Sequence, residues 1–240
     1  MRSIHRRDLL VRAASLGGLA LGAAQAEESP RKLKVVVTGG HPGDPEYGCG
    51  GTIARLADLG HSVVLLYLND GVPAGKPKDG ARVAEARNAS EILGARPTFA
   101  GQVDGEAVVD REHAEGFARL LRSEAPDVVF THWPIDDHAD HRATSMLVYD
   151  AWLRMGRRFA LYYYEVSNGE DTHQFTPTHH VDITATEPRK RRACFAHATQ
   201  SPERYYSLQE QVTRFRGIER GCRHAEGFIR HARSPDISLP

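Results

Sequence analysis

Short apolar runs alternate with longer segments of mixed polarity along most of this 240-residue chain. The apolar runs are rich in β-branched and aromatic residues, which is typical of strands buried in a sheet. Strands are expected at 32–38, 62–68, 96–100, 127–130, 159–166 and 179–184. Helices are expected at 48–59, 81–93, 111–124, 141–155, 187–197 and 207–228. Because strands and helices alternate, the pattern predicts an α/β fold with a doubly wound, mostly parallel sheet and helices on both faces.

Two clusters of polar residues follow two of the expected strands. Residues 41–44 read HPGD, and residues 138–141 read HADH, a few residues after a later strand. Loops at the carboxyl ends of parallel strands converge on one crevice, so we expect His41, Asp44 and His141 to surround one ion. Two imidazoles and a carboxylate, with a fourth position left to water, suit a catalytic zinc ion. The two clusters therefore predict a metal-dependent hydrolase.

Three glycines after the first cluster, Gly48, Gly50 and Gly51, invite comparison with a dinucleotide-binding loop. Counted from Gly48, the GxGxxG pattern requires its last glycine where this chain has Ile53. We therefore expect these glycines to let the helix pack closely beside the site rather than to bind a nucleotide. Basic and acidic residues are equal in number, 31 each, which gives no indication of nucleic-acid binding.

The first 26 residues have the features of a twin-arginine signal peptide. Arg6 and Arg7 precede a weakly hydrophobic stretch at 13–23, and the small residues before Glu27 predict cleavage there. The apolar stretch is too short and too rich in glycine and alanine to form a stable membrane span. The sequence thus predicts export to the periplasm, or secretion, and a single mature domain over 27–240.

The chain has three cysteines, Cys49, Cys194 and Cys222. An oxidising compartment permits one disulfide, for which Cys194 and Cys222 are the favoured pair. No CxxC pattern is present in the sequence, so the cysteines do not predict a zinc site.

Both polar clusters belong to longer motifs that resemble those of the PIG-L/LmbE-like family of zinc-dependent N-deacetylases. The family's first motif, H-P-D-D-x-E-x-G-x-G-G-T, is similar to residues 41–52 (HPGDPEYGCGGT). Its second motif, P-x-D-x-H-x-D-H, is similar to residues 134–141 (PIDDHADH), and weaker signatures resemble 181–184 and 197–200. The resemblance covers roughly the whole mature chain and implies a Rossmann-like fold. It also implies removal of acetyl groups from N-acetylglucosamine units of glycolipids, thiol glycosides or antibiotics.

The resemblance implies roles for individual residues. His41, Asp44 and His141 match the family's zinc ligands; because no cysteine is among them, iron and manganese are alternative metals. His138 matches a residue that stabilises the oxyanion or protonates the leaving amine, and Asp140 matches a carboxylate that orients a neighbouring imidazole. The expected partner is a small molecule or glycan that carries an N-acetyl group, and a homo-oligomer is one option for the assembly.

One position departs from the family motif. Gly43 stands where the family has the aspartate that acts as general base, and loss of such a base costs about 10²–10⁴ in rate. The candidate substitutes are Glu46, Asp70, Asp136 and Asp137. Two functions therefore stay open: a zinc-dependent deacetylase of an N-acetylated sugar, or a non-catalytic zinc- or carbohydrate-binding protein on the same fold. Hydrolysis of another amide is a third, weaker alternative.

Overall fold

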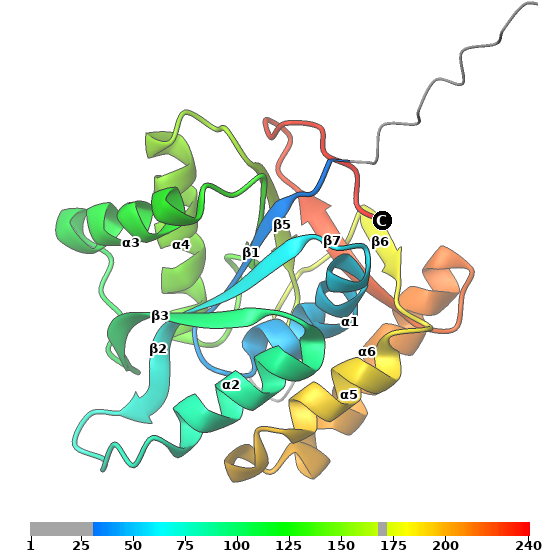
Figure 1. Cartoon of the computed structure of the whole chain (residues 1–240), viewed down its shortest axis with the longest axis horizontal. Helices are drawn as coiled ribbons and strands as arrows, with labels where there is room; N and C mark the ends of the chain where they lie inside the picture. Colours follow the sequence, from blue (N-terminus) through cyan, green and yellow to red (C-terminus); the bar gives the residue numbers. More distant parts are fainter. Residues whose placement is uncertain (1–30, 168–171) are drawn as a thin grey trace, which may run out of the picture. The chain divides into compact units, whose positions relative to one another are not determined.

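The computed structural model describes residues 31–167 and 172–240 (Figure 1). The signal peptide predicted at 1–26 lies outside these residues. The strands are β1 (Lys34–Gly39), β2 (Ser62–Pro73), β3 (Arg96–Asp104), β4 (Val128–His132), β5 (Ala160–Tyr164), β6 (His179–Asp182) and β7 (Ala225–Arg230). The helices are α1 (Asp44–Asp58), α2 (Ala81–Leu93), α3 (Arg111–Glu124), α4 (Ala139–Arg154), α5 (Glu187–Phe195), the short 3-10 helix η1 (Ala198–Gln200) and α6 (Pro202–Arg220).

The strands form one 7-stranded sheet in the order β3-β2-β1-β4-β5-β7-β6. Strands β1 to β5 pair in parallel, whereas β7 pairs antiparallel with both β5 and β6. The order of the first five strands is that of a Rossmann-type sheet. The predicted α/β fold with a mostly parallel, doubly wound sheet is therefore confirmed.

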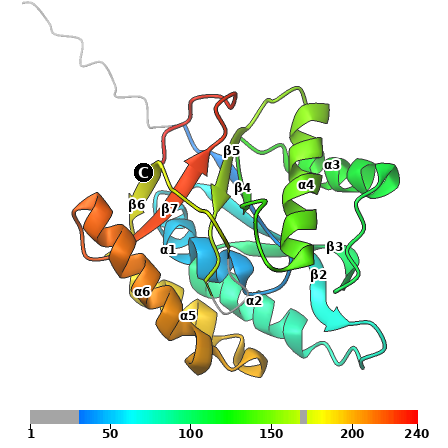
Figure 2. The ribbon, with the colours of Figure 1, turned by 180° about the vertical axis from the view of Figure 1, so that it is seen from behind.

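Helices cover both faces of the sheet (Figure 2). On one face, α1, α2 and α5 pack over a core that includes Val37 and Leu65, and on the other, α3 and α4 pack over Val36 and Leu66. Successive residues of a strand point to opposite faces of a sheet, which explains why the first two strands are apolar at consecutive positions. Among the described helices, none is long and apolar enough to cross a membrane.

The strand order reverses beside β1. From β1 the chain continues to β2 on one side, while β4 lies on the other side of β1. The loops that follow β1 and β4 therefore begin where the strand order reverses, which is where open α/β sheets bind ligands. These loops carry the HPGD and HADH segments, so the fold brings both clusters to one crevice.

Glycines in the first turns of α1 allow this helix to lie directly on its neighbours. A Cβ atom on Gly48 would lie 2.3 Å from Cδ2 of Tyr164, and one on Gly51 would lie 2.6 Å from Cβ of Ile183. The structure thus confirms that these glycines serve close packing. They fix the N-terminus of α1, and with it Asp44, beside β5.

The C-terminal region differs from the helix expected at 207–228. Helix α6 ends at Arg220, Gly221 adopts a left-handed conformation with φ of 80°, and the chain then enters β7. β7 gains its strand conformation by pairing with β5 and β6. Because those partners are distant in sequence, the local apolar pattern of this segment did not indicate a strand.

The disulfide expected between Cys194 and Cys222 is wrong, since all three cysteines are free. Cys194 faces the core from α5 and is fully buried. Cys222 follows α6, is partly exposed, and donates its thiol proton to the backbone oxygen of His224 at 3.3 Å. The two sulfur atoms therefore belong to different environments.

Candidate active site

The first cluster forms a tight loop between β1 and α1. Gly43 precedes the helix with φ of 117°, and its N–H donates to Oε2 of Glu46 at 3.2 Å. Asp44 is the first residue of the helix, and its Oδ2 accepts a hydrogen bond from the backbone N–H of His41 at 2.8 Å. The loop therefore holds the carboxylate of Asp44 and the imidazole of His41 side by side.

The second cluster forms the beginning of α4. His138 caps this helix: its Nδ1 accepts a hydrogen bond from the backbone N–H of Asp140 at 3.1 Å. Asp136 lies just before the helix, and its Oδ1 is 2.9 Å from Nδ1 of His141 and also accepts the backbone N–H of His138. These bonds fix both imidazoles against the first loop.

The two loops bring the predicted metal ligands together. Oδ2 of Asp44 lies 3.4 Å from Nδ1 of His41 and 3.2 Å from Nε2 of His141. Ligands on a tetrahedral zinc ion with bonds of about 2.0–2.1 Å are separated by about 3.3 Å, which these distances match. Nε2 of His141 is buried and makes no well-formed hydrogen bond; its contact is the ion pair with Asp44. The donor set and these separations fit a zinc ion.

Electrostatics within the cluster favour a charged pair when no metal is bound. Burial opposes both charges, yet attraction to His141 lowers the pKa of Asp44 well below its usual range. Although burial also works against a charged His141, attraction to Asp44 and the hydrogen bond with Asp136 raise the pKa of His141 to about 9. The metal-free cluster therefore holds a proton that metal binding would displace.

The structure adds His132, which the sequence patterns did not single out. It ends β4, is fully buried, and stacks on His141 with ring centroids 4.0 Å apart and an angle of 8° between the planes. Its Nε2 lies 3.2 Å from Oδ2 of Asp44. A metal ion lies near the plane of each imidazole that binds it, so two rings stacked face to face do not share one ion. His132 therefore packs against two of the predicted ligands, Asp44 and His141, and does not bind the ion itself as a third imidazole.

Asp140 orients the imidazole of His41, not that of His138. Its Oδ2 lies 3.1 Å from Nε2 of His41 and accepts hydrogen bonds from Nδ2 of Asn69 at 3.0 Å and the backbone N–H of Gly105 at 2.9 Å. A carboxylate bound to the second nitrogen of a ligating histidine fixes the ring and its tautomer. His41 is thus left with Nδ1 directed toward Asp44.

A second carboxylate that the sequence patterns missed also contacts His41. Asp104 is the last residue of β3, and its Oδ1 lies 3.1 Å from Nε2 of His41. The strand was expected to end at Ala100, four residues too early, which left Asp104 outside the carboxyl end of the strand. If the strand had been expected to reach Asp104, the sequence would have placed this carboxylate at the same crevice as the two clusters.

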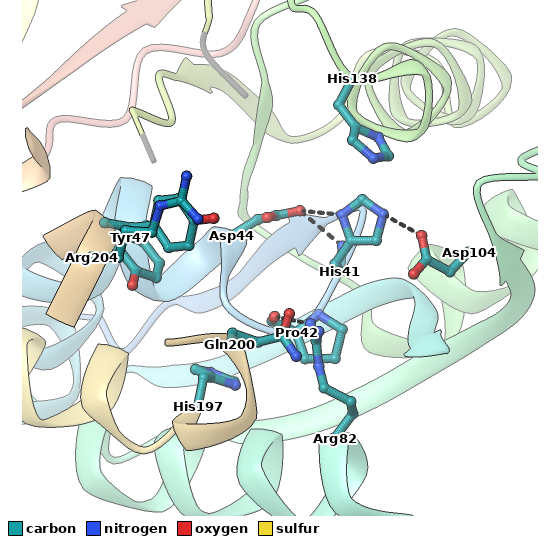
Figure 3. Close-up of a pocket in the computed structure, with 11 residues that line it drawn as sticks. His41, Pro42, Asp44, Tyr47, Arg82, Asp104, His138, His197, Gln200 and Arg204 are labelled. Atoms are coloured by element: carbon teal, nitrogen blue, oxygen red, sulfur yellow. Dashed lines mark hydrogen bonds and ion pairs between the residues drawn. The ribbon is translucent and has the colours of Figure 1, made fainter. Parts of the chain in front are cut away.

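An open pocket of about 420 Å³ lies against these residues (Figure 3). His41, Asp44 and His138 contribute to its wall from the two clusters. The other lining residues come from the β1–α1 segment, α2, β3 and the segment from His197 to α6: Pro42, Tyr47, Arg82, Asp104, His197, Gln200, Arg204 and Tyr205. The volume falls within the range of small-molecule sites.

The four candidate substitutes for the missing base do not line this pocket. Glu46 is fully buried and accepts hydrogen bonds from the Tyr67 hydroxyl, His197 and the Gly43 N–H. The remaining three have other partners: Asp136 bonds His141 and Thr172, Asp137 pairs with His173, and Asp70 pairs with Lys78. Glu46 therefore holds the shape of the loop.

Comparison with known proteins identifies the family. The family model for GlcNAc-PI de-N-acetylase, PIG-L, matches residues 36–152. A diacetylchitobiose deacetylase of Thermococcus kodakarensis is 31% identical over 222 residues, which cover 81% of this chain and 82% of that protein. The chain belongs to the PIG-L family.

Two solved structures are similar over most of their length. The conserved protein TT1542 from Thermus thermophilus has a TM-score of 0.74 and 31% identity, and the match covers 87% of this chain and 98% of that chain. An N,N'-diacetylchitobiose deacetylase from Pyrococcus horikoshii, complexed with an inhibitor, has a TM-score of 0.71 and 25% identity, with 87% and 89% covered. The α/β fold is therefore the fold of these proteins.

Proposed function

We propose that this protein is a metal-dependent hydrolase that removes the acetyl group from an N-acetylated sugar of the N-acetylglucosamine type. The observation that carries the proposal is the cluster of His41, Asp44 and His141 beside a pocket of substrate size. Membership of the PIG-L family and similarity to diacetylchitobiose deacetylases support an acetamide on an amino sugar as the reacting group.

Zinc is the ion that we propose for this cluster. Two imidazoles and one carboxylate are a common ligand set for catalytic zinc, and Nε2 of His141, which faces Asp44 without a well-formed hydrogen bond, is suited to bind it. When bound, zinc polarises a carbonyl group and lowers the pKa of a coordinated water to about 7. Asp140 and Asp136 would hold His41 and His141 in the orientation that binding requires.

His138 is suited to stabilise negative charge on the acetyl oxygen. Its Nδ1 accepts a backbone hydrogen bond, so a neutral ring would carry its single proton on Nε2. The ring lines the pocket and lies 4.5 Å from the ring of His41, centroid to centroid. A neutral imidazole donates a hydrogen bond to an oxyanion more readily than it gives up its only proton. This geometry favours the oxyanion role over protonation of the leaving amine.

The outer part of the pocket supports a sugar as the substrate. Arg82, Gln200 and Arg204 line it together with the aromatic ring of Tyr47. Polar groups of this kind form hydrogen bonds with hydroxyl groups, and a tyrosine ring packs against the apolar face of a pyranose.

We also propose export through the twin-arginine route, on the basis of Arg6 and Arg7 and the small residues before Glu27. Replacement of both arginines by lysine should leave the precursor in the cytoplasm. Accumulation of this variant in the periplasm at the normal level would contradict the proposal.

The deacetylase proposal is tested by measuring acetate release from a panel of N-acetyl sugars that includes N,N'-diacetylchitobiose. The zinc-loaded protein should release acetate, chelation should abolish the release, and added zinc should restore it. Binding of these sugars without any acetate release would instead support the non-catalytic alternative. His113→Ala, a variant of a partly exposed histidine on α3, is a control that should keep full activity.

A further inference from the structure

Helix α6 carries an apolar stripe on its outer side. The two most exposed large hydrophobic side chains among the described residues, Ile218 at 76% and Phe215 at 55%, both belong to this helix, and Leu208 is 38% exposed. The inner side of α6 packs against β6, β7 and α5. In Figure 2, α6 lies in front of α5 at the margin of the described fold. Exposed apolar residues gathered on one side of a helix are typical of an interaction surface.

The stripe has the spacing of a helix that pairs with another helix. Arg204, Leu208, Gln211, Phe215 and Ile218 follow one another at intervals of four, three, four and three residues, which is the seven-residue repeat of paired helices. Gln211 lies at the centre of the stripe, with Leu208 towards one end and Phe215 towards the other. A single polar residue within an apolar seam fixes the register of two helices.

The two ends of the stripe carry opposite charges. Arg204 lies in the first turn of α6, and Glu219 lies in its last turn. The side chain of Glu219 contacts Arg216 and His180 yet stays 36% exposed. Two parallel copies of α6 would bring like charges together. Two antiparallel copies would bring each Arg204 towards the Glu219 of the other copy, so the charges of this surface are complementary to themselves.

We propose that α6 is the interface of a two-fold symmetric dimer, in which two copies of the helix pair antiparallel about Gln211. Leu208 of each copy packs on Phe215 of the other, and Arg204 of each copy pairs with Glu219 of the other. Interfaces of this self-complementary kind are the commonest among soluble homo-oligomers. Apolar packing stabilises the pair, and the charges select its direction.

An anionic lipid surface fits this helix less well than a second copy does. Such a surface attracts basic residues and repels acidic ones. Glu203, Glu210 and Glu219 are distributed along α6 among its arginines. The mixed charge of the helix therefore favours a partner whose charge is equally mixed.

The proposed interface reaches the pocket. Arg204 and Tyr205 line the pocket from the first turn of α6. In the antiparallel pair, the last turn of the second copy's helix lies beside this turn, and its Glu219 holds the Arg204 guanidinium. A substrate in the pocket thus meets an arginine whose position depends on the dimer. This last consequence rests on the proposed deacetylase function, whereas the dimer itself does not.

The size of the stripe sets the expected strength of the dimer. A helix of 19 residues is about 28 Å long and about 10 Å wide. Two such faces bury less than the roughly 1,200 Å² that separates weak complexes from stable ones. We therefore expect a Kd of about 10–100 µM, at the weak end of specific association.

Sedimentation velocity of the protein at about 1–200 µM, a range that brackets this Kd, tests the dimer. The sedimentation coefficient should rise with concentration from that of a monomer to that of a dimer. Phe215→Glu places a charge at the centre of the packing and should weaken association more than about 30-fold, as loss of an interface hot spot does. Met146→Glu, at a side chain on α4 that is 46% exposed, is the matched control and should dimerise like wild type.

Charge exchange tests the direction of the helices. Arg204→Glu and Glu219→Arg should each weaken the dimer by about 3–10-fold, as expected for exposed ion pairs. The double variant should recover most of the loss, because the opposite charges again face each other. Circular dichroism of each variant should match wild type, which separates a lost contact from a lost fold.

A disulfide tests the position of the two-fold axis. Gln211→Cys in a Cys222→Ser background should form a covalent dimer on oxidation, because the two new thiols lie beside the axis. With N,N'-diacetylchitobiose as the substrate, the oxidised form should have a KM about threefold below that of the reduced form, which corresponds to one surface ion pair. Equal KM values would overturn the contact between the dimer and the pocket.

Four results would overturn the dimer. These are a monomer at every concentration, a dimer that persists in Phe215→Glu, a double charge variant that recovers nothing, and a monomer that binds phosphatidylglycerol vesicles through Phe215. The last result would make α6 a membrane surface instead. A protein that dimerises as expected but releases no acetate from any N-acetyl sugar would contradict the proposed function and leave the dimer intact.

Discussion

Two regions of the site differ in how firmly the protein holds them. The inner cluster consists of His41, Asp44, His132, Asp140 and His141, all of them buried. The outer wall consists of Arg82, Asp104, Gln200 and Arg204, which are partly or fully exposed. Each carboxylate and imidazole of the inner cluster contacts at least one other member of it. The outer wall is drawn from α2, β3 and the segment around α6.

This difference separates two tasks. A cluster of buried groups fixed before any ligand arrives suits metal binding and charge stabilisation, where small displacements are costly. A partly exposed wall of long polar side chains suits contact with a solvated sugar. Asp104 joins the two regions, because it contacts His41 inward and the pocket outward.

Loss of a metal ligand should have the largest effect on the inner cluster. His141→Ala removes a ligand and leaves Asp44 and Asp136 buried without their common partner. We expect metal affinity to fall by more than about 100-fold, which is the upper end of the loss from a supporting residue, and activity to disappear. Metal analysis after dialysis measures this loss, with His113→Ala as control. Stoichiometric metal in His141→Ala would show that the ion binds elsewhere.

His138 lies where the inner cluster meets the pocket, and its removal should affect turnover rather than metal. His138→Ala is expected to lower kcat by about 10²–10³, the usual cost of one oxyanion donor. Zinc content should stay at one per chain. Parallel measurements of kcat and zinc content check this, and a variant that loses its zinc would place His138 among the ligands instead.

Asp140→Asn should weaken zinc binding by the inner cluster although it removes no zinc ligand. The amide cannot match the carboxylate that holds Nε2 of His41 and accepts the Gly105 N–H. We expect zinc affinity to fall by about 10–100-fold and activity to recover when zinc is added in excess. Zinc titration of the metal-free variant measures the change. Activity that stays low at saturating zinc would mean that Asp140 also takes part in the reaction.

Gly43→Asp restores the family's residue and tests whether the first loop accepts it. The φ of 117° makes an aspartate strained there, at a cost of about 1–3 kcal/mol. For a protein of this size, Tm should fall by about 2–4 °C per kcal/mol, and kcat should not rise. Thermal unfolding measures the change in Tm, and steady-state kinetics measures the change in kcat. A clear gain in kcat would indicate that the loop rearranges and that the absent base limits the reaction.

The pH dependence of the metal-free protein tests the charged pair in the inner cluster. The pKa of His141 is raised to about 9, above its unfolded value of about 6.5. The folded state therefore binds this proton more tightly, so the stabilisation is complete below pH 6.5 and is lost as pH rises through about 9. Urea unfolding should show a free energy that falls across this range. Zinc-loaded protein should show a weaker fall, because the metal replaces the proton.

The inner cluster was largely predictable from sequence because its members lie in two short motifs. His41, Asp44, Asp140 and His141 follow strands whose carboxyl ends meet at one crevice. The fold was predictable for a related reason, since consecutive apolar residues mark strands that are buried on both faces.

The outer wall was not predictable in this way. Asp104 ends a strand that extends further than its apolar run, and Arg82 and Arg204 lie on helices with no adjacent motif. His132 was missed because it ends β4, two residues beyond the strand end expected at 130, and belongs to neither polar motif. β7 was predicted as helix because its conformation depends on β5 and β6, which are distant in sequence. Whether such residues reach the site, and whether such a segment is a strand, depends on pairing between distant segments and on side-chain direction. Neither produces a recognisable pattern in the local sequence.

Anomalous diffraction at the zinc absorption edge, from crystals of zinc-loaded protein, tests most directly whether the inner cluster is a metal centre. We predict one strong peak, about 2.0–2.2 Å from a ring nitrogen of His41, a carboxylate oxygen of Asp44 and Nε2 of His141. The same map should show His132 stacked on His141 and outside bonding distance of the ion. A peak bound by the outer wall, or no peak at the cluster in crystals that contain zinc, would contradict the account.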